Sequence, residues 1–240
     1  MIDLLRADCC RLKSWGVFYL SLICLMGGDL LNEVIKRGIQ KKNRSFSEMM
    51  ISGTEQKVLF LLAGILLLFY INQERESGFQ QQTEPLCPKW KQIAEKLLFG
   101  AMISFLMELF FFIEHLAKVF YFRASWTEME IIQAEAFWIG SLFLCIAFAA
   151  AGICLAQWIR QIWGAAAVFF LFVWGWPLYF VFEKMTSVVG GAAFLPYGMF
   201  QTFLKFCQDI REGTFLQVIG ISLAWTAGFG GFAFLGRLRR

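Results

Sequence analysis

Apolar residues in this chain form long runs that short polar or charged segments separate. A helix needs about 20 mostly apolar residues to cross a hydrocarbon core of roughly 30 Å. None of the runs shows the strict alternation of apolar and polar residues that is typical of an outer-membrane barrel. The pattern therefore predicts an all-α integral membrane protein. We expect six transmembrane helices, at about 15–35, 54–71, 97–117, 136–158, 164–182 and 215–235.

Residues 1–14 precede the first predicted span and have a different pattern. Ile2, Leu5, Cys9 and Leu12 recur at three- and four-residue spacing, and charged residues occupy other positions. This spacing places the apolar side chains on one face of a helix. We expect a short interfacial helix that lies on the membrane surface.

The uncharged run between Lys184 and Lys205 is long enough for a seventh span. Several glycines and Pro196 interrupt its middle, where a simple transmembrane helix would keep its backbone hydrogen bonds unbroken. We therefore expect residues 185–212 to form a re-entrant or extracellular hairpin before the last span. With six spans, both termini lie on the same side of the membrane.

The composition supports a membrane protein and argues against nucleic acid as a partner. Hydrophobic residues make up 58% of the chain and charged residues 17%, which lies outside the range of soluble domains. The formal net charge is only +4, and the basic residues are spread along the chain instead of forming one patch. Lysines and arginines divide evenly between the two sides of the six-span arrangement, so charge alone leaves the orientation open.

Several common catalytic and cofactor motifs are absent from the sequence. His115 is the only histidine, no glycine precedes a lysine as in a P-loop, and the seven cysteines include no Cys-x-x-Cys pair. The cysteines are typical of reduced, structural thiols. We expect no catalytic residue, no metal site and no cofactor bound by this chain.

Residues 72–96 form the one long polar insertion between predicted spans. Pro85 and Pro88 break any helix there, and the stretch from Lys89 to Lys96 restarts one that leads into the third span. Such a segment cannot lie in lipid. We expect a loop outside the hydrocarbon core.

Together with the N-terminal amphipathic segment and the predicted hairpin, this loop resembles that of a known family. The chain is similar to the permease subunits of type-2 ABC transporters, the exporter group that includes bacteriocin-immunity and toxic-peptide efflux systems. In that family the loop has two acidic residues and a glycine, then a variable stretch, a proline, a basic residue and a lysine that enters the third span. The matching positions are Glu74, Glu76, Gly78, Pro88, Lys89 or Lys91, and Lys96. The strongly basic first outer loop and Cys87 before Pro88 depart from the usual family pattern.

The resemblance implies that residues 79–90 form a coupling helix that docks on a separate ABC-type ATP-binding subunit. That partner would carry ATP and Mg²⁺, so this chain is not expected to be an enzyme. A second permease, either a copy or a paralogue, would complete the transporter. The residues expected to couple to the ATPase are Glu76, Gly78, Phe79, Glu84, Leu86, Pro88, Lys89 and Trp90, with the aromatic residues and Leu86 as apolar anchors.

The resemblance also implies a substrate class and a location. The substrate would be an amphipathic or hydrophobic peptide of the antimicrobial or toxin-like kind. The chain would be a multi-pass protein of the bacterial cell membrane, with cytoplasmic N and C termini.

Ionisable residues inside the predicted spans suggest further roles. Glu108 lies near the middle of the third span, where an ionised carboxylate is costly. It either hydrogen-bonds to a neighbouring helix or faces the substrate path. An alternative function is an intramembrane lipid-modifying enzyme that uses Glu108 and His115. Glu114 and Lys118 are one helical turn apart and are expected to pair.

The last predicted span carries small residues at four-residue spacing, at Gly220, Ala224 and Gly228. This spacing is typical of a face where transmembrane helices pack closely. It fits packing within the subunit and a dimer interface equally well.

Overall fold

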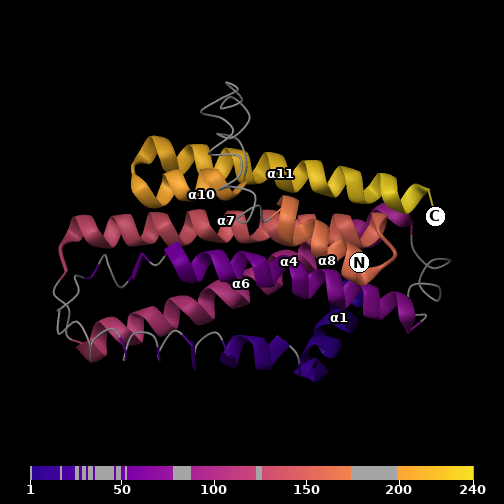
Figure 1. The fold of residues 1–240 in the computed structure, drawn as a ribbon, viewed down its shortest axis with the longest axis horizontal. Helices are drawn as coiled ribbons and strands as arrows, with labels where there is room; N and C mark the ends of the chain where they lie inside the picture. The colour runs from indigo at the N-terminus through magenta and orange to yellow at the C-terminus, as the bar shows by residue number, and fades with distance from the viewer. Residues whose placement is uncertain are drawn as a thin grey trace.

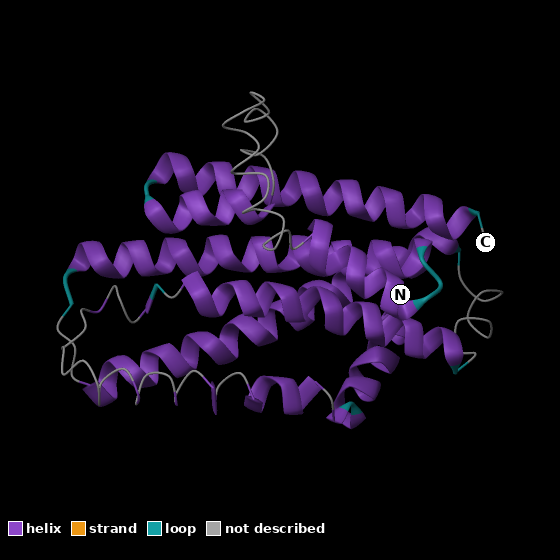
Figure 2. Ribbon diagram, viewed as in Figure 1, coloured by secondary structure: helices purple, strands orange, loops and turns teal. Residues whose placement is uncertain are grey.

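Every regular element that the structure describes is helical (Figure 2). The computed structural model describes residues 2–16, 18–24, 27–28, 31, 35, 46, 50–51, 53–77, 88–122, 126–173 and 199–239. The elements are α1 (Ile2–Ser14), α4 (Gly53–Glu76), α6 (Lys89–Phe122), α7 (Glu128–Trp158), α8 (Ile162–Val168), the π-helix η1 (Phe169–Val173), α10 (Met199–Gln208) and α11 (Glu212–Leu238).

Four helices are long and apolar enough to cross a membrane, namely α4, α6, α7 and α11. They cover the predicted second, third, fourth and sixth spans. Helices α4, α6 and α11 extend beyond both predicted ends, and α7 begins earlier than predicted but ends at Trp158 as predicted. The all-helical fold and these four candidate spans are therefore confirmed. Three predicted segments are only partly described. The residues that lie outside the described part are 17, 25–26, 29–30 and 32–34 of the first span, 174–182 of the fifth span and 185–198 of the hairpin.

The long helices lie side by side, with α7 in the centre (Figure 1). Helices α10 and α11 lie on one side of α7, and α4 and α6 lie on the other. The C-terminal end of α4, the start of α6, helix α1, the turn from α7 to α8 and the C-terminus all gather at one end, which we call the α1 end. The start of α7 and the turn from α10 to α11 gather at the opposite end, which we call the α10 end.

Two glycines set the close approach of α4 and α7. A Cβ atom added at Gly152 of α7 would lie 2.2 Å from the backbone oxygen of Gly64 in α4. A Cβ atom at Gly64 would in turn lie 1.9 Å from the ring of Phe169 in η1. Only glycine fits at this crossing, because any larger side chain would push the three elements apart.

Local signals explain where two of the long helices begin. The side chain of Thr127 accepts a hydrogen bond from the Glu130 amide, and the Glu130 carboxylate accepts one from the Thr127 amide, which is a capping box before α7. At the start of α6 the Pro88 carbonyl accepts hydrogen bonds from the amides of Lys91 and Gln92. Pro88 thus immediately precedes α6, which begins at Lys89 where the sequence predicts that a helix restarts.

Three glycines at the predicted close-packing spacing of α11 make no packing contact within the described part of the chain. A Cβ atom added at Gly220, Gly228 or Gly231 would meet nothing within 4 Å. By contrast, Gly230 and Gly236, on another face of α11, are buried next to Leu97 and Trp158. The spaced glycines of the predicted close-packing face therefore lie on the outer surface of the helix.

Candidate functional site

Ionisable side chains from three helices meet where α1 packs against α4 and α6. Helix α1 supplies Asp8 and Arg11, and the carboxyl of Asp8 is 1% exposed. Helix α4 supplies Tyr70 and Glu74, and the second turn of α6 supplies Glu95 and Lys96. We call Asp8, Arg11, Tyr70, Glu74, Glu95 and Lys96 the ion cluster.

Lys96 is the centre of the ion cluster. Its Nζ atom lies 2.6 Å from Asp8 Oδ2, 2.8 Å from Glu74 Oε1 and 3.4 Å from Glu95 Oε2. Arg11 Nη1 donates to the same Glu74 oxygen at 2.6 Å, and the Tyr70 hydroxyl donates to Asp8 Oδ1 at 3.0 Å. One ammonium group therefore joins all three helices.

The ion cluster contains three carboxyl groups and two basic groups. Burial acts to raise the pKa of Asp8, but the hydrogen bond from Glu95 and the positive charge of Lys96 outweigh it, so that the pKa is lowered. The lowered pKa favours the ionised form of Asp8 beside Lys96.

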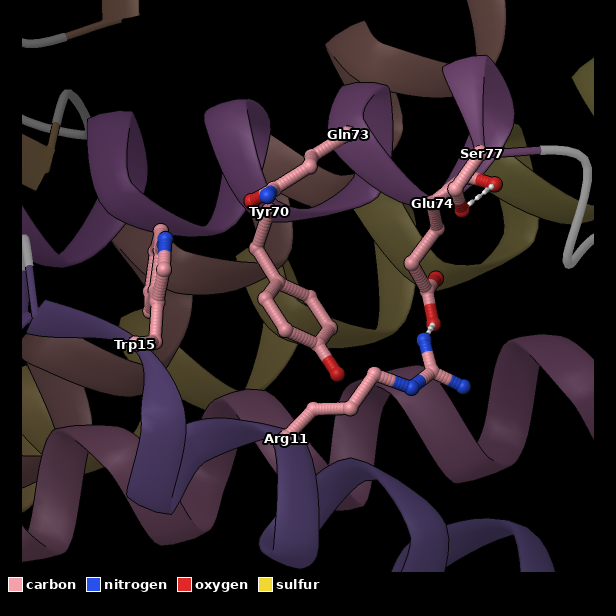
Figure 3. A pocket seen from close by; sticks show the side chains of 6 residues that line it. All are labelled: Arg11, Trp15, Tyr70, Gln73, Glu74 and Ser77. Carbon is pink, nitrogen blue, oxygen red and sulfur yellow. Dashed lines mark hydrogen bonds and ion pairs between the residues drawn. The ribbon is translucent and has the colours of Figure 1, made fainter.

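A cavity of about 200 Å³ opens beside the ion cluster (Figure 3). Arg11 and Trp15 reach into it from the N-terminal part of the chain, and the Arg11 guanidinium points toward the Glu74 carboxylate of α4. The other lining residues all come from α4 and the turn that follows it. They are Tyr70, Gln73, Glu74 and Ser77.

The residues expected to couple to an ATPase are only partly described. Glu76 accepts a hydrogen bond from Asn72 at 2.8 Å, which keeps it on the last turn of α4. Pro88 and Lys89 lie at the start of α6, and the Trp90 side chain is 57% exposed there. Gly78, Phe79, Glu84 and Leu86 lie outside the described residues.

Glu108 is buried between helices, with 4% of its surface exposed. Its Oε2 atom accepts a hydrogen bond from Gln56 Nε2 of α4 at 3.2 Å. Of the two interpretations that the sequence leaves open, this contact favours the hydrogen bond to a neighbouring helix.

Glu114, His115 and Lys118 follow on the same helix. Lys118 Nζ lies 3.1 Å from Glu114 Oε1, which confirms the predicted pair. His115 Nδ1 lies 2.8 Å from the Phe111 carbonyl, and its ring contacts Trp138 at 5.3 Å between centroids. His115 is seven residues beyond Glu108, about 10 Å along the helix axis. The structure thus places the two residues of the enzyme hypothesis two turns apart.

A larger groove, of about 930 Å³, lies at the α10 end between α7 and the turn from α10 to α11. Its lining is mainly apolar and includes charged side chains, among which Arg211 pairs with Asp209 at 2.7 Å. The lining includes Met129, Ile132, Ile139 and Phe215 together with Glu135 and Glu212.

Neither a metal-binding group among the described residues nor a similar curated protein was found. Within the described residues, no group of three or more histidines, cysteines, aspartates or glutamates could hold a metal ion. No protein-family model and no curated protein matches the chain.

The sequence pattern does not predict the ion cluster as a unit. The pattern predicts α1 as a helix on the membrane surface, with its charges away from the apolar face. Yet Leu5, Asp8 and Leu12 follow one another at three- and four-residue spacing, so Asp8 lies on the same face as the apolar residues. An acidic residue on an apolar face is the signal that predicts a buried partner.

Proposed function

We propose that this chain is the transmembrane subunit of an ATP-driven ABC exporter for amphipathic or hydrophobic peptides. The observation that carries the proposal is the position of the polar insertion. It leaves α4 and enters α6 at the α1 end, and the ion cluster joins these same two helices to α1.

This arrangement suits the transmission of a motion that starts outside the membrane. Packed helices shift between discrete arrangements rather than deforming continuously. An ATP-binding subunit that pulls on the insertion would therefore move α4 and α6 together, with α1 held to both by Lys96. In this proposal the α1 end is cytoplasmic and the partner ATPase supplies ATP and Mg²⁺.

The substrate class is supported by the family resemblance and by the groove at the α10 end. A mainly apolar lining that includes charged side chains suits a peptide that has an apolar face and a charged face. The peptide would be antimicrobial or toxin-like, and a second permease, as a copy or a paralogue, would complete the path. The membrane would be the cell membrane of a bacterium.

The exposed side chain of Trp90 gives the first test. Trp90→Ala removes the described apolar anchor of the insertion, and we expect binding of the ATPase to weaken by about 2 kcal/mol, or roughly 30-fold. The matched control is Trp126→Ala, because Trp126 is also half-exposed, at 47%, but lies just before α7 at the opposite end. The measurement is the amount of P-loop ATPase that co-purifies with the tagged chain from its native membranes, and the ATP turnover of that preparation.

The outcomes separate the parts of the proposal. If no ATPase co-purifies with the wild-type chain, the exporter assignment is wrong. If the ATPase co-purifies equally with wild type, Trp90→Ala and Trp126→Ala, the exporter assignment stands but Trp90 is not an anchor.

A further inference from the structure

A second polar cluster lies inside the bundle and is separate from the ion cluster. We call Gln56, Ser104, Glu108, Ser141 and Cys145 the mid-bundle cluster. They come from α4, α6 and α7, and none is more than 4% exposed. Polar groups at such depth are costly unless something binds them.

The contacts place the members of this cluster together. Gln56 donates to Glu108 at 3.2 Å, and Ser104 and Glu108 of α6 lie near Cys145 of α7. Helices α6 and α7 run in opposite directions, and a Cβ atom at Gly100 would lie 3.7 Å from Ala149.

The register of these two helices then places Ser141. Gly100 faces Ala149, and one turn along α6 Ser104 faces Cys145. One further turn brings Glu108 opposite Ser141, because each step of four residues forward on α6 is four residues back on α7.

Oxygen atoms in the mid-bundle cluster are left without partners. The amide nitrogen of Gln56 donates a hydrogen bond to one Glu108 oxygen. The carbonyl oxygen of Gln56 and the second carboxyl oxygen of Glu108 have no hydrogen-bond partner. The hydroxyls of the two serines are also buried without a hydrogen bond. The four atoms are Gln56 Oε1, Ser104 Oγ, Glu108 Oε1 and Ser141 Oγ.

Glu108 also has no basic partner among the described residues. In the described part of the chain no lysine, arginine or histidine forms an ion pair with it. The nearest lysine along α6 is Lys118, which pairs with Glu114. Lys57 follows Gln56 in α4 and lies near Cys207 of α10. A buried carboxylate needs a proton or a cation.

We propose that the mid-bundle cluster binds one Na⁺ ion. Carboxylate, amide and hydroxyl oxygens are the ligands that hard cations prefer, and a single carboxylate balances one positive charge rather than two. A proton bridges two oxygen atoms, whereas a sodium ion binds more than two, and the cluster leaves four oxygen atoms without partners. The inference is independent of the proposed exporter function, because it needs neither the ATPase nor the peptide.

Thermal unfolding of the full-length protein in lipid nanodiscs tests the proposal. At constant ionic strength, replacing choline chloride by NaCl is expected to raise Tm along a saturating curve. At ten times the dissociation constant the rise should be about 3–6 °C for a chain of this size. Binding of ²²Na⁺ should reach one ion per chain.

Three variants make the test specific. Glu108→Gln removes the charge and is expected to abolish both the rise and the bound ²²Na⁺, and Ser141→Ala should shift the curve to higher Na⁺ concentration. The matched control, Glu114→Gln, alters a buried carboxyl of the same helix that Lys118 already balances, and it should keep the wild-type response.

Two results would overturn the proposal. One is a wild-type chain whose Tm and ²²Na⁺ binding do not respond to Na⁺, which would assign Glu108 a proton instead. The other is a response to Na⁺ that survives Glu108→Gln.

Discussion

Lys96 shows how a single buried side chain can join three helices. Its ammonium group lies within 3 Å of carboxylate oxygens from α1 and α4, and its own side chain is only 12% exposed. Removing one partner of a buried ion pair leaves the other charge uncompensated, which costs more than the pair itself contributes. Removing the Lys96 ammonium group would therefore leave buried carboxylates on α1 and α4 without this partner.

Lys96→Met tests the effect of this removal. The variant keeps the volume of the side chain but leaves Asp8 and Glu74 without the ammonium group, so we expect the free energy of unfolding to fall by about 3–5 kcal/mol. Lys91→Met, five residues earlier on α6, removes a partly exposed lysine and should change it by no more than about 0.5 kcal/mol. Chemical denaturation in detergent measures both. Equal stabilities for the two variants would contradict the role given to Lys96.

The ion cluster also predicts how stability depends on pH. Because the folded protein lowers the pKa of Asp8, it binds fewer protons there than the unfolded chain does. The stabilisation is present above the unfolded pKa of about 3.9 and is lost as the pH falls through the folded value.

Asp8→Asn removes this dependence on pH. We expect the variant to be less stable than wild type at pH 7 and to lose less Tm between pH 5 and pH 3. Parallel Tm curves for the two proteins over that range would show that Asp8 does not titrate with folding.

At the scale of elements, α4 and α7 depend on the absence of side chains where they cross. The Cβ position of Gly152 is 2.2 Å from backbone, which cannot move aside as a flexible side chain can. The π-helix η1 also packs at this crossing, because the Phe169 ring lies over Gly64.

Gly152→Ala is therefore expected to destabilise the protein by about 1–3 kcal/mol or more through overpacking. Gly228→Ala in α11 is the matched control, since its Cβ atom would meet nothing within 4 Å. Without a clash, alanine should stabilise the helix by about 0.5–1 kcal/mol relative to glycine. Thermal unfolding of both variants checks the opposite signs, and a stabilised Gly152→Ala would show that the crossing is looser than described.

For the whole molecule, the arrangement of the ends gives a test of orientation. Cys10 is exposed in α1, and the turn from α10 to α11 is at the other end. Cys207 near that turn is a poor reporter, because burial raises the pKa of its thiol to about 12. Five lysines and arginines lie in residues 36–44, outside the described residues. The structure therefore does not change the even division of basic residues between the two sides of the predicted arrangement.

A chain with one cysteine at a time resolves the orientation. If the N-terminus is cytoplasmic, a membrane-impermeant maleimide should label Glu212→Cys in intact cells, because Glu212 is exposed at the α10 end. Cys10 should react only after the cells are permeabilised. Labelling of Cys10 alone in intact cells would invert the topology.

The sequence by itself determined the class of the fold and the positions of four long helices. Hydrophobic length sets where a helix can cross a bilayer, and Pro88 and the pair of Thr127 and Glu130 set where two of them begin, since these signals are local. It also placed the pair of Glu114 and Lys118, because one helical turn fixes that contact.

Only the tertiary structure decided which buried polar groups meet. Asp8 and Lys96 are 88 residues apart, and Gln56 and Glu108 are 52 apart. Spacing along one helix shows that such a residue needs a partner, but the partner follows from how helices far apart in the sequence pack. The same holds for Gly152, whose need for glycine arises from the Gly64 backbone that approaches it from another helix.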